Sequence, residues 1–217
     1  MTSVNPSSAQ VEDILLTSPA AGVAQITLNQ EATRNSLSLA MLNLLMQKLE
    51  KVAADASYKV VILNATGRVF SAGHNLKEVQ GQLGNHQAQL ALFQRCAEVM
   101  QKIVNLPKPV IASVRGVATA AGCQLVASCD LAIATEDARF ATPGVNIGLF
   151  CSTPMVALSR NVPAKIAMEM LLTGQMLSAD RALAYGLVNK LVADTDLETA
   201  TLEMAELIAG KSAKTLA

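Results

Sequence analysis

The sequence has few aromatic residues, no tryptophan and no excess charge of either sign. Aromatic residues make up 3% of the 217 residues, and Lys plus Arg and Asp plus Glu each number 17. Proteins that bind nucleic acid usually combine a basic surface with aromatic side chains that stack on bases, and anionic lipids also attract basic surfaces. We therefore expect neither a nucleic acid nor a membrane among the partners.

Spacings typical of metal sites or redox pairs are also missing. The four cysteines are Cys96, Cys123, Cys129 and Cys151. They form no Cys-x-x-Cys pair, and the two histidines, His74 and His86, are not spaced with them as zinc ligands would be. Most of the cysteines stand inside apolar runs, so we interpret them as buried free thiols in a reducing compartment. No metal is expected.

No segment has the features of a leader peptide or a membrane span. No basic residue precedes Arg34, so the first residues lack the charged start of a signal or transit peptide. No apolar run approaches the roughly 20 residues that a membrane helix needs. These absences favour a cytoplasmic protein.

The composition is that of one folded domain. Hydrophobic residues make up 51% of the chain and charged residues 16%, which is enough for a sizeable core. Residues 1–11 are rich in Ser, Asn and Pro and are expected to be a flexible lead. Residues 12–217 are expected to form the domain.

Apolar periodicity predicts alternating strands and helices. Residues 13–17 and 23–28 form a predicted hairpin, interrupted by Pro19 and Gly22. Further strands are predicted at 59–63, 110–114 and 131–134, and helices from Ser38 to Val52 and at 88–103, 118–129, 163–172 and 196–208. Strand-plus-helix units thus recur about every 40 to 50 residues, which indicates an α/β fold.

The chain is organised around the stretch from Val114 to Gly148, which an apolar run over residues 109–114 begins. The β-branched run to Val114 reads as a buried strand, and a turn follows at Arg115-Gly116. From Ala118 onward most residues are small, which suits a buried helix whose first turn is approached closely by something else. A helix start carries free N–H groups and positive dipole, so it can hold developing negative charge.

Three ordered motifs resemble the enoyl-CoA hydratase/isomerase (crotonase) superfamily. They are GVATAAGCQLVASCD at 116–130, FSAGHNLK at 70–77 and ATPGVNIGL at 141–149. More narrowly, the sequence resembles the enoyl-CoA hydratase domain-containing protein 3 type. The resemblance implies a ββα superhelix, an acyl-CoA ligand, lyase or isomerase chemistry of fatty acid metabolism, and homotrimers or hexamers. It implies no cofactor, because coenzyme A is part of the substrate.

The resemblance also implies an oxyanion hole and a coenzyme A site. Backbone N–H groups of His74 and Ala121 would hold the thioester oxygen, and each such donor is worth about 3 to 4 kcal/mol in a dry site. Alternatives for His74 are acid or base catalysis by its ring, as a similarity to methylmalonyl-CoA decarboxylase suggests, or a surface loop histidine. The substrate-binding positions implied are Arg34, Ala72, His74, Asn75, Leu76, Lys77, Ala121 and Gly122. Arg34 is alternatively a solvated loop charge, and Asn75 stands where the family usually has Asp.

Both catalytic glutamates of the family are replaced. Gln124 stands one helical turn beyond Ala121, and Gly144 follows Pro143. An amide can hold a water but cannot take its proton, and glycine offers no side chain. We therefore expect hydration to be weak or altered.

No other side chain is spaced as a replacement. Glu78, Asp130, Glu136, Asp137 and Glu169 are interpreted as structural or solvated, and Cys151 and Ser152 have no basic partner nearby in sequence. Relatives continue with helices that close over the ligand, so this helical lid is expected to be missing. Three hypotheses follow: a weak or altered hydratase/isomerase, a non-catalytic acyl-CoA-binding protein, and a decarboxylase of malonyl-type thioesters.

Overall fold

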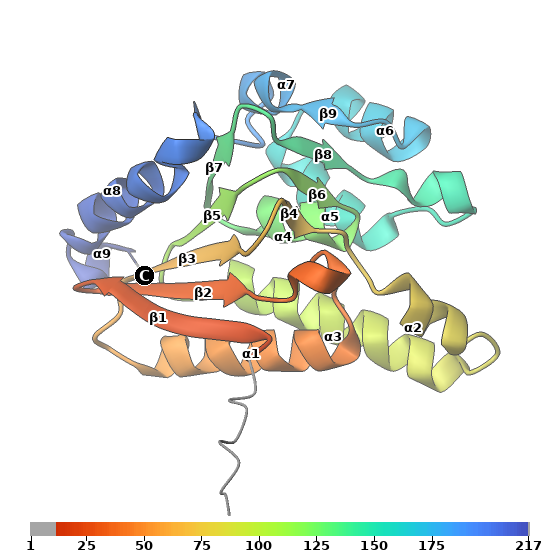
Figure 1. Cartoon of the computed structure of the whole chain (residues 1–217), viewed down its shortest axis with the longest axis horizontal. Helices are drawn as coiled ribbons and strands as arrows, with labels where there is room; N and C mark the ends of the chain where they lie inside the picture. Colours follow the sequence, from red (N-terminus) through yellow and green to blue (C-terminus); the bar gives the residue numbers. More distant parts are fainter. Residues whose placement is uncertain (1–11, 217) are drawn as a thin grey trace, which may run out of the picture.

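The computed structural model describes residues 12–216, which form two β-sheets with helices packed around them (Figure 1). The expected flexible lead, residues 1–11, lies outside the described residues. The larger sheet has the strand order β1-β2-β3-β5-β7-β10. Its strands are β1 (Ile14–Ala20), β2 (Val23–Leu28), β3 (Val60–Ala65), β5 (Val110–Val114), β7 (Leu131–Thr135) and β10 (Lys190–Val192).

The first two strands form the predicted hairpin, and the other neighbours in the larger sheet pair in parallel. Pro19 was expected to end the first strand, but it lies inside β1. It is tolerated because β1 is an edge strand whose register shifts between Thr17 and Ala20, so no neighbour requires the missing N–H group.

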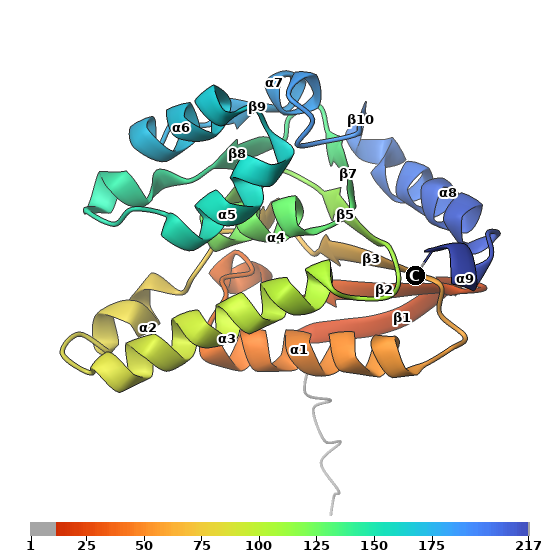
Figure 2. The ribbon, with the colours of Figure 1, turned by 180° about the vertical axis from the view of Figure 1, so that it is seen from behind.

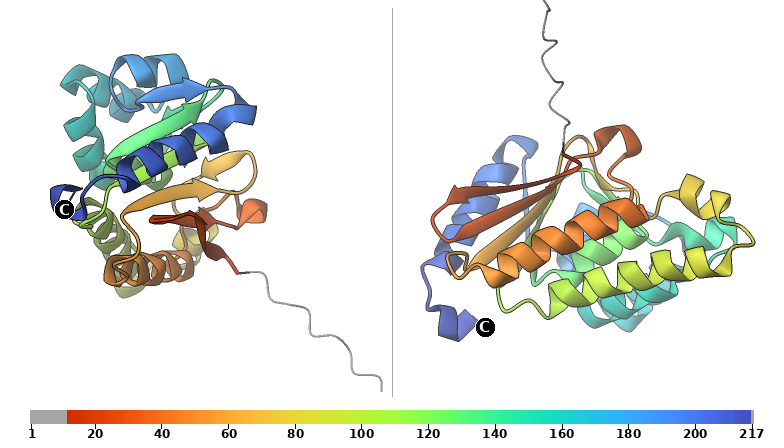
Figure 3. Two further views of the ribbon diagram at one scale, coloured as in Figure 1. Left: turned by 90° about the vertical axis from the view of Figure 1, so that its left-hand side faces the viewer. Right: turned by 90° about the horizontal axis from the view of Figure 1, so that it is seen from below.

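Side chains of the larger sheet alternate between two hydrophobic layers. In β3, Val61 and Leu63 join the main core, whereas Val60 and Ile62 face a second cluster. This follows from the two-residue period of a strand. Helices α1 (Leu39–Ala54) and α3 (His86–Val104) run side by side under the main-core face (Figure 2), and α8 (Leu197–Ala209) covers the other face (Figure 3).

A second sheet, which the sequence did not indicate, has the strand order β4-β6-β8-β9. Its strands are β4 (Val69–Ser71), β6 (Val117–Thr119), β8 (Arg139–Ala141) and β9 (Leu177–Ser178). Each of β3, β5 and β7 is followed by a strand of this sheet and then by helix, so the ββα repeat is confirmed. One boundary was wrong: the helix expected from Ala118 begins at Ala121, because Val117–Thr119 pair with β4 and β8.

The remaining helices are short and lie around the second sheet and at the end of the chain. They are α2 (Leu76–Gly81), α4 (Ala121–Ser128), α5 (Ser152–Asn161), α6 (Ala164–Thr173), α7 (Ala179–Ala184) and α9 (Ala213–Leu216), with 3-10 turns at Glu31–Thr33, Pro143–Ile147 and Asp194–Asp196. Gly174 ends α6 in the left-handed conformation that glycine adopts readily. No helix among residues 12–216 has both the length and the apolar character needed to cross a bilayer.

Candidate functional site

The turn after β4 and the start of α4 are in close contact, and a glycine makes this possible. Gly73 has φ +84°, and a Cβ atom placed on it would lie 2.8 Å from the Ala120 Cβ, 2.9 Å from the Thr119 carbonyl oxygen and 3.2 Å from the Ala121 nitrogen. Only a residue without a side chain allows these two backbones to approach so closely.

Two backbone N–H groups at this contact make no hydrogen bond. The turn is held by Leu37, which donates to the Gly73 carbonyl at 2.8 Å and accepts from the Asn75 N–H at 3.3 Å. The N–H groups of His74 and Ala121 have no acceptor among the described residues. Buried N–H groups usually find a partner, so these two are available to a ligand.

The start of α4 has an unusual backbone. Ala120 precedes the helix with φ 50° and ψ −120°, and its N–H donates to the Ala141 carbonyl at 2.9 Å. A left-handed φ at alanine costs about 1 to 3 kcal/mol, so surrounding contacts must hold it. One such contact is the close packing of Gly122 against the Ser71 carbonyl oxygen, which a Cβ atom at position 122 would press into.

A cavity of about 380 Å³ lies beside these amides, and both His74 and Ala121 line it. Its walls are mainly apolar and include Leu76, Phe93 and Phe150. No Asp, Glu, Lys or Arg is among the lining residues. The cavity therefore offers hydrogen-bond donors from the backbone but no carboxylate for acid–base work.

The two positions of the missing glutamates line adjoining cavities. Gly144 lines the cavity beside the amides, whereas Gln124 lines a neighbouring one of about 710 Å³ between α3, α4 and α5. Thr153 lines both. Gln124 is only 6% exposed, and its Oε1 has no hydrogen-bond partner among residues 12–216. A Cβ on Gly144 would press on the Leu149 carbonyl oxygen and lie 2.8 Å from the Cys151 Sγ.

The imidazole of His74 is one of the titratable groups that line this cavity. It packs edge-on against Phe93, with ring centroids 4.9 Å apart and an interplanar angle of 70°. Its Nε2 is buried and has no hydrogen-bond partner in the described part of the chain. Burial lowers the pKa of His74 to about 4, since a low-polarity surrounding disfavours the charged ring. The ring is therefore neutral at pH 7.

Cys151 and Ser152 line the same cavity as His74, a proximity that their separation in sequence did not suggest. Burial raises the pKa of the Cys151 thiol. A thiol that stays protonated is a poor nucleophile, so the arrangement does not activate Cys151 for covalent chemistry.

Asn75 caps the helix that follows the turn. Its side-chain oxygen accepts from the N–H groups of Lys77 at 3.1 Å and Glu78 at 3.3 Å. Asp and Asn serve equally well at this position, so the departure from the family residue preserves the local structure. Leu76 begins the helix and lines the cavity, while the Lys77 side chain is exposed.

Arg34 is attached to the turn through its backbone. Its carbonyl accepts from the Ala72 N–H at 3.0 Å, and its side chain is exposed with no ion pair among the described residues. Its neighbour Asn35, which sequence reasoning missed, is fully buried with φ 50°. The Asn35 amide donates to the carbonyls of Thr66 at 2.9 Å and Val69 at 2.8 Å, so it fixes the loop beside β4.

The other acidic residues considered above are engaged elsewhere. Glu78 accepts from the Leu39 N–H at 3.1 Å and so caps α1, and Asp130 accepts from the Val110 N–H at 2.7 Å. Asp137 accepts from the Thr135 hydroxyl, and its neighbour Glu136 is exposed. Glu169 pairs with Arg181 at 2.8 Å, which lowers the pKa of its carboxyl group. None of them lines the cavity.

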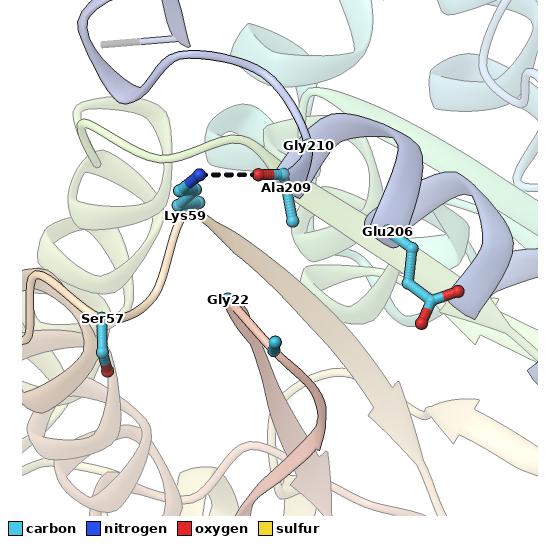
Figure 4. Close-up of a pocket in the computed structure, with 7 residues that line it drawn as sticks. Gly22, Ser57, Lys59, Glu206, Ala209 and Gly210 are labelled. Carbon is cyan, nitrogen blue, oxygen red and sulfur yellow. Dashed lines mark hydrogen bonds between the residues drawn. The ribbon is translucent and has the colours of Figure 1, made fainter.

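A further cleft lies at the opposite end of the parallel strands and has a structural explanation. It is lined by Gly22 and Lys59, which precede β2 and β3, and by the end of α8 (Figure 4). The Lys59 Nζ donates to the Ala209 carbonyl at 2.9 Å and thereby satisfies the last turn of that helix. Among residues 12–216, no three His, Cys, Asp or Glu side chains are grouped as metal ligands would be.

Comparison with known proteins identifies the family. The sequence profile described as enoyl-CoA hydratase/isomerase matches residues 18–217. The chain is 50% identical to the rat enoyl-CoA hydratase domain-containing protein 3, mitochondrial, over 90% of this chain and 65% of that protein. It is also 50% identical to the human protein of the same name, over 88% of this chain and 63% of that protein. The chain thus spans about two thirds of the length of these relatives.

Solved structures agree. The crystal structure of the human domain-containing protein 3 has a TM-score of 0.90 at 47% identity, covering 94% of this chain and 80% of that one. The crystal structure of an enoyl-CoA hydratase from Mycobacterium smegmatis has a TM-score of 0.92 at 49% identity, covering 95% of this chain and 80% of that one. The resemblance to the domain-containing protein 3 type is therefore confirmed.

The cytoplasmic location is contradicted, because five relatives of 48 to 51% identity carry the word mitochondrial in their names. The inference rested on the N-terminal residues, and location is encoded in targeting segments rather than in a folded domain. The fold and the family resemblance are unaffected by this correction. This chain, with its ββα superhelix, belongs to the enoyl-CoA hydratase/isomerase family.

Proposed function

We propose that the protein binds acyl-CoA thioesters and holds the thioester oxygen between the N–H groups of His74 and Ala121. The observation that supports this most directly is the pair of N–H groups without acceptors, on two backbones brought together at Gly73, beside an apolar cavity. Two such donors polarise a thioester carbonyl and stabilise the enolate that acyl-CoA chemistry forms.

Hydration of an enoyl-CoA is weak or altered in this proposal. The reaction needs a base to activate water and an acid to protonate the α-carbon, and a positioned group of either kind typically contributes about 10² to 10⁴ in rate. Neither Gln124 nor Gly144 can transfer a proton, and no carboxylate lines the cavity. The oxyanion hole alone leaves a low residual rate.

The coenzyme A portion is proposed to lie along the turn and the start of α4. The exposed cations Arg34 and Lys77 flank this turn and suit the phosphate groups of coenzyme A. Ala72, Asn75 and Leu76 belong to the turn itself. The small residue Gly122 keeps the helix start close to it. No separate cofactor takes part.

Two other functions fit the same site. The first is acyl-CoA binding without catalysis, which the missing acid and base allow. The second is decarboxylation of a malonyl-type thioester. The bond between the α-carbon and the carboxylate breaks, and CO₂ leaves. The electron pair of that bond forms the enolate held by the two amides, and solvent then protonates the α-carbon. That reaction requires no base from the protein.

The assembly is also a proposal. By family resemblance we propose a homotrimer or hexamer, which sedimentation equilibrium would test against the 22.7 kDa mass of one chain.

Calorimetric titration and two activity assays test the proposal together. We expect butyryl-CoA to bind more tightly than free coenzyme A, and crotonyl-CoA to be hydrated at least about 10²-fold more slowly than by a family enzyme that carries both glutamates. Hydration at the rate of that enzyme would contradict the proposed roles of Gln124 and Gly144.

The assays also separate the alternatives. Release of CO₂ from methylmalonyl-CoA would favour the decarboxylase, and tight binding with neither reaction would favour the non-catalytic protein. Failure to bind any acyl-CoA would contradict the oxyanion site itself.

A further inference from the structure

The peptide group that joins Ala72 to Gly73 is held on both sides by side-chain hydroxyl groups. Its N–H donates to the Ser71 hydroxyl at 3.3 Å, and its carbonyl accepts from the Thr119 hydroxyl at 3.1 Å. The N–H and C=O of a trans peptide point in opposite directions, so partners on opposite sides fix the plane of the group. This peptide directly precedes the one that carries the N–H of His74.

The next peptide group, from Gly73 to His74, takes its direction from this one. Its carbonyl accepts from the Leu37 N–H at 2.8 Å, and its N–H, which points the opposite way, is one of the two without an acceptor. The angle between the two peptide groups is set by φ and ψ of Gly73, which has no side chain to restrict them. The direction of the His74 N–H therefore depends on the hydrogen bonds that hold residues 72–73.

Thr119 also connects this turn to the second proposed donor. It ends β6 and lies two residues before Ala121, and its acceptor Ala72 lies two residues before His74. Its hydroxyl thus joins the two chain segments that carry the donors, where these segments touch around Gly73. Thr119 is not among the residues that line the cavity, so it acts on a ligand only through the backbone.

An oxyanion hole works only when both of its donors aim at the same oxygen. Each donor must lie about 2.7 to 3.1 Å from the position that the oxyanion takes. Backbone N–H groups cannot adjust by side-chain rotation, so their spacing depends on how the two segments are held together. A displacement of about 1 Å can cost about 10²-fold in rate, so one hydrogen bond between the segments has a large effect on the site.

We infer that Thr119 is a positioning residue whose hydroxyl holds the turn against the start of α4, so that the N–H groups of His74 and Ala121 converge on one thioester oxygen. This inference rests on the proposed acyl-CoA site and adds a residue outside the cavity on which that site depends. The hydroxyl of Thr119, rather than its methyl group or the general stability of the fold, then determines how strongly the bound thioester carbonyl is polarised.

Infrared difference spectroscopy measures that polarisation directly, with butyryl-CoA labelled with ¹³C at the thioester carbonyl. Hydrogen bonds to the carbonyl oxygen lower its stretching frequency, and the label separates this band from those of unlabelled groups. In the wild-type protein we expect one band at lower frequency than that of the free ligand. In Thr119→Val, which keeps the branched shape but lacks the hydroxyl, the band is expected to move back toward the free-ligand frequency and to broaden.

Two further variants supply a rescue and a matched control. Thr119→Ser keeps the hydroxyl and is expected to restore the wild-type band. Thr201→Val makes the same change in α8, at a buried threonine whose hydroxyl donates to the Leu197 carbonyl at 2.7 Å and lies 3.0 Å from the Ser113 Oγ. It is expected to lose at least as much stability as Thr119→Val in urea denaturation and to leave the band unchanged.

Calorimetric titration of the same variants gives the energetic consequence. The preference for butyryl-CoA over free coenzyme A is expected to fall about fivefold in Thr119→Val, the effect of one neutral hydrogen bond. In Thr119→Ser and Thr201→Val the preference is expected to match that of the wild-type protein.

The outcomes separate this inference from the proposed function. An unchanged band in Thr119→Val, an equal change in Thr201→Val, or no recovery in Thr119→Ser would overturn the inference and leave the acyl-CoA site intact. If the wild-type protein binds no butyryl-CoA, or binds it without lowering the carbonyl frequency, the proposed function fails, and the inference with it. Should Thr119→Val not fold, Thr119→Ala removes the same hydroxyl without added bulk and replaces it in every comparison.

Discussion

At the scale of single residues, the site depends on Gly73 in two ways. Its φ of +84° disfavours any other residue, and its lack of a side chain lets the turn touch the start of α4. A second glycine in the chain separates these effects. Gly84 also has φ +84°, but a Cβ placed on it would meet nothing within 4 Å.

We predict that Gly73→Ala is much more damaging than Gly84→Ala. The Gly84 variant is expected to lose about 1 kcal/mol of unfolding free energy, because only the unfavourable φ destabilises it. The Gly73 variant must also separate two backbones, so we expect a loss of about 2 to 4 kcal/mol and at least a tenfold loss of butyryl-CoA affinity. Urea denaturation and calorimetric titration measure the two quantities. Equal losses of stability in both variants would show that the close approach is unimportant.

The sequence predicted some of these special residues and not others. Gly73 lies in one of the three motifs that the sequence analysis singled out, FSAGHNLK at 70–77. Nothing in the sequence marked Ala120, because alanine rarely adopts φ 50° and is forced to do so here by contacts with other segments. Asn35 was hidden for a similar reason: its hydrogen-bond partners, Thr66 and Val69, are more than 30 residues away.

At the scale of elements, the short helix α2 supports the cavity wall. It carries Leu76 and Val79, both of which line the cavity, but no residue of the helix is fully buried. A helix of six residues is unstable by itself, so its cap at Asn75 matters more than usual.

We predict that Asn75→Ala lowers the unfolding free energy by about 1 kcal/mol and weakens butyryl-CoA binding, whereas Asn75→Asp changes neither quantity appreciably. The alanine variant loses the acceptor for two N–H groups, while aspartate keeps it and adds a favourable charge at the helix start. Asn85→Ala, at the exposed cap of α3, is the matched control and should reduce stability without reducing affinity. A loss of affinity in the control as well would indicate a general effect of helix caps.

Apolar periodicity located the long elements well and the short ones poorly. The helices at α1, α3, α6 and α8 and the central strands were predicted within a few residues. Three-residue strands such as β6 lack a usable period, and they form only because β4 and β8 lie on either side. The start of α4 was therefore placed three residues too early, on residues that belong to a strand.

At the scale of the whole molecule, the candidate site is assembled from segments far apart in the chain. Leu37, the turn at Gly73, the start of α4 and the segment from Gly144 to Pro154 meet at one cavity or its edge. The separation of Gln124 and Gly144 into neighbouring cavities depends on this packing, so sequence spacing alone could not reveal it.

This arrangement leads to a prediction about restoring the missing glutamates. A Cβ atom placed on Gly144 would press on the Leu149 carbonyl oxygen. It would also lie 2.8 Å from the Cys151 Sγ. Any side chain at this position must displace the segment that forms one wall of the cavity. The double variant Gln124→Glu with Gly144→Glu is therefore expected to lose about 1 to 3 kcal/mol of unfolding free energy and to gain no more than about tenfold in crotonyl-CoA hydration.

Gly81→Glu is the matched control for that variant, because a Cβ on Gly81 would meet nothing within 4 Å and its φ is not positive. We expect its stability to stay within about 0.5 kcal/mol of wild type in urea denaturation. If the double variant instead folds with wild-type stability and hydrates crotonyl-CoA about 10² times faster than the wild type, the wall at Gly144 is more adaptable than its contacts indicate. The loss of hydratase chemistry would then reside in the two side chains alone, whereas the expected result assigns it to the packing of the 144–151 segment as well.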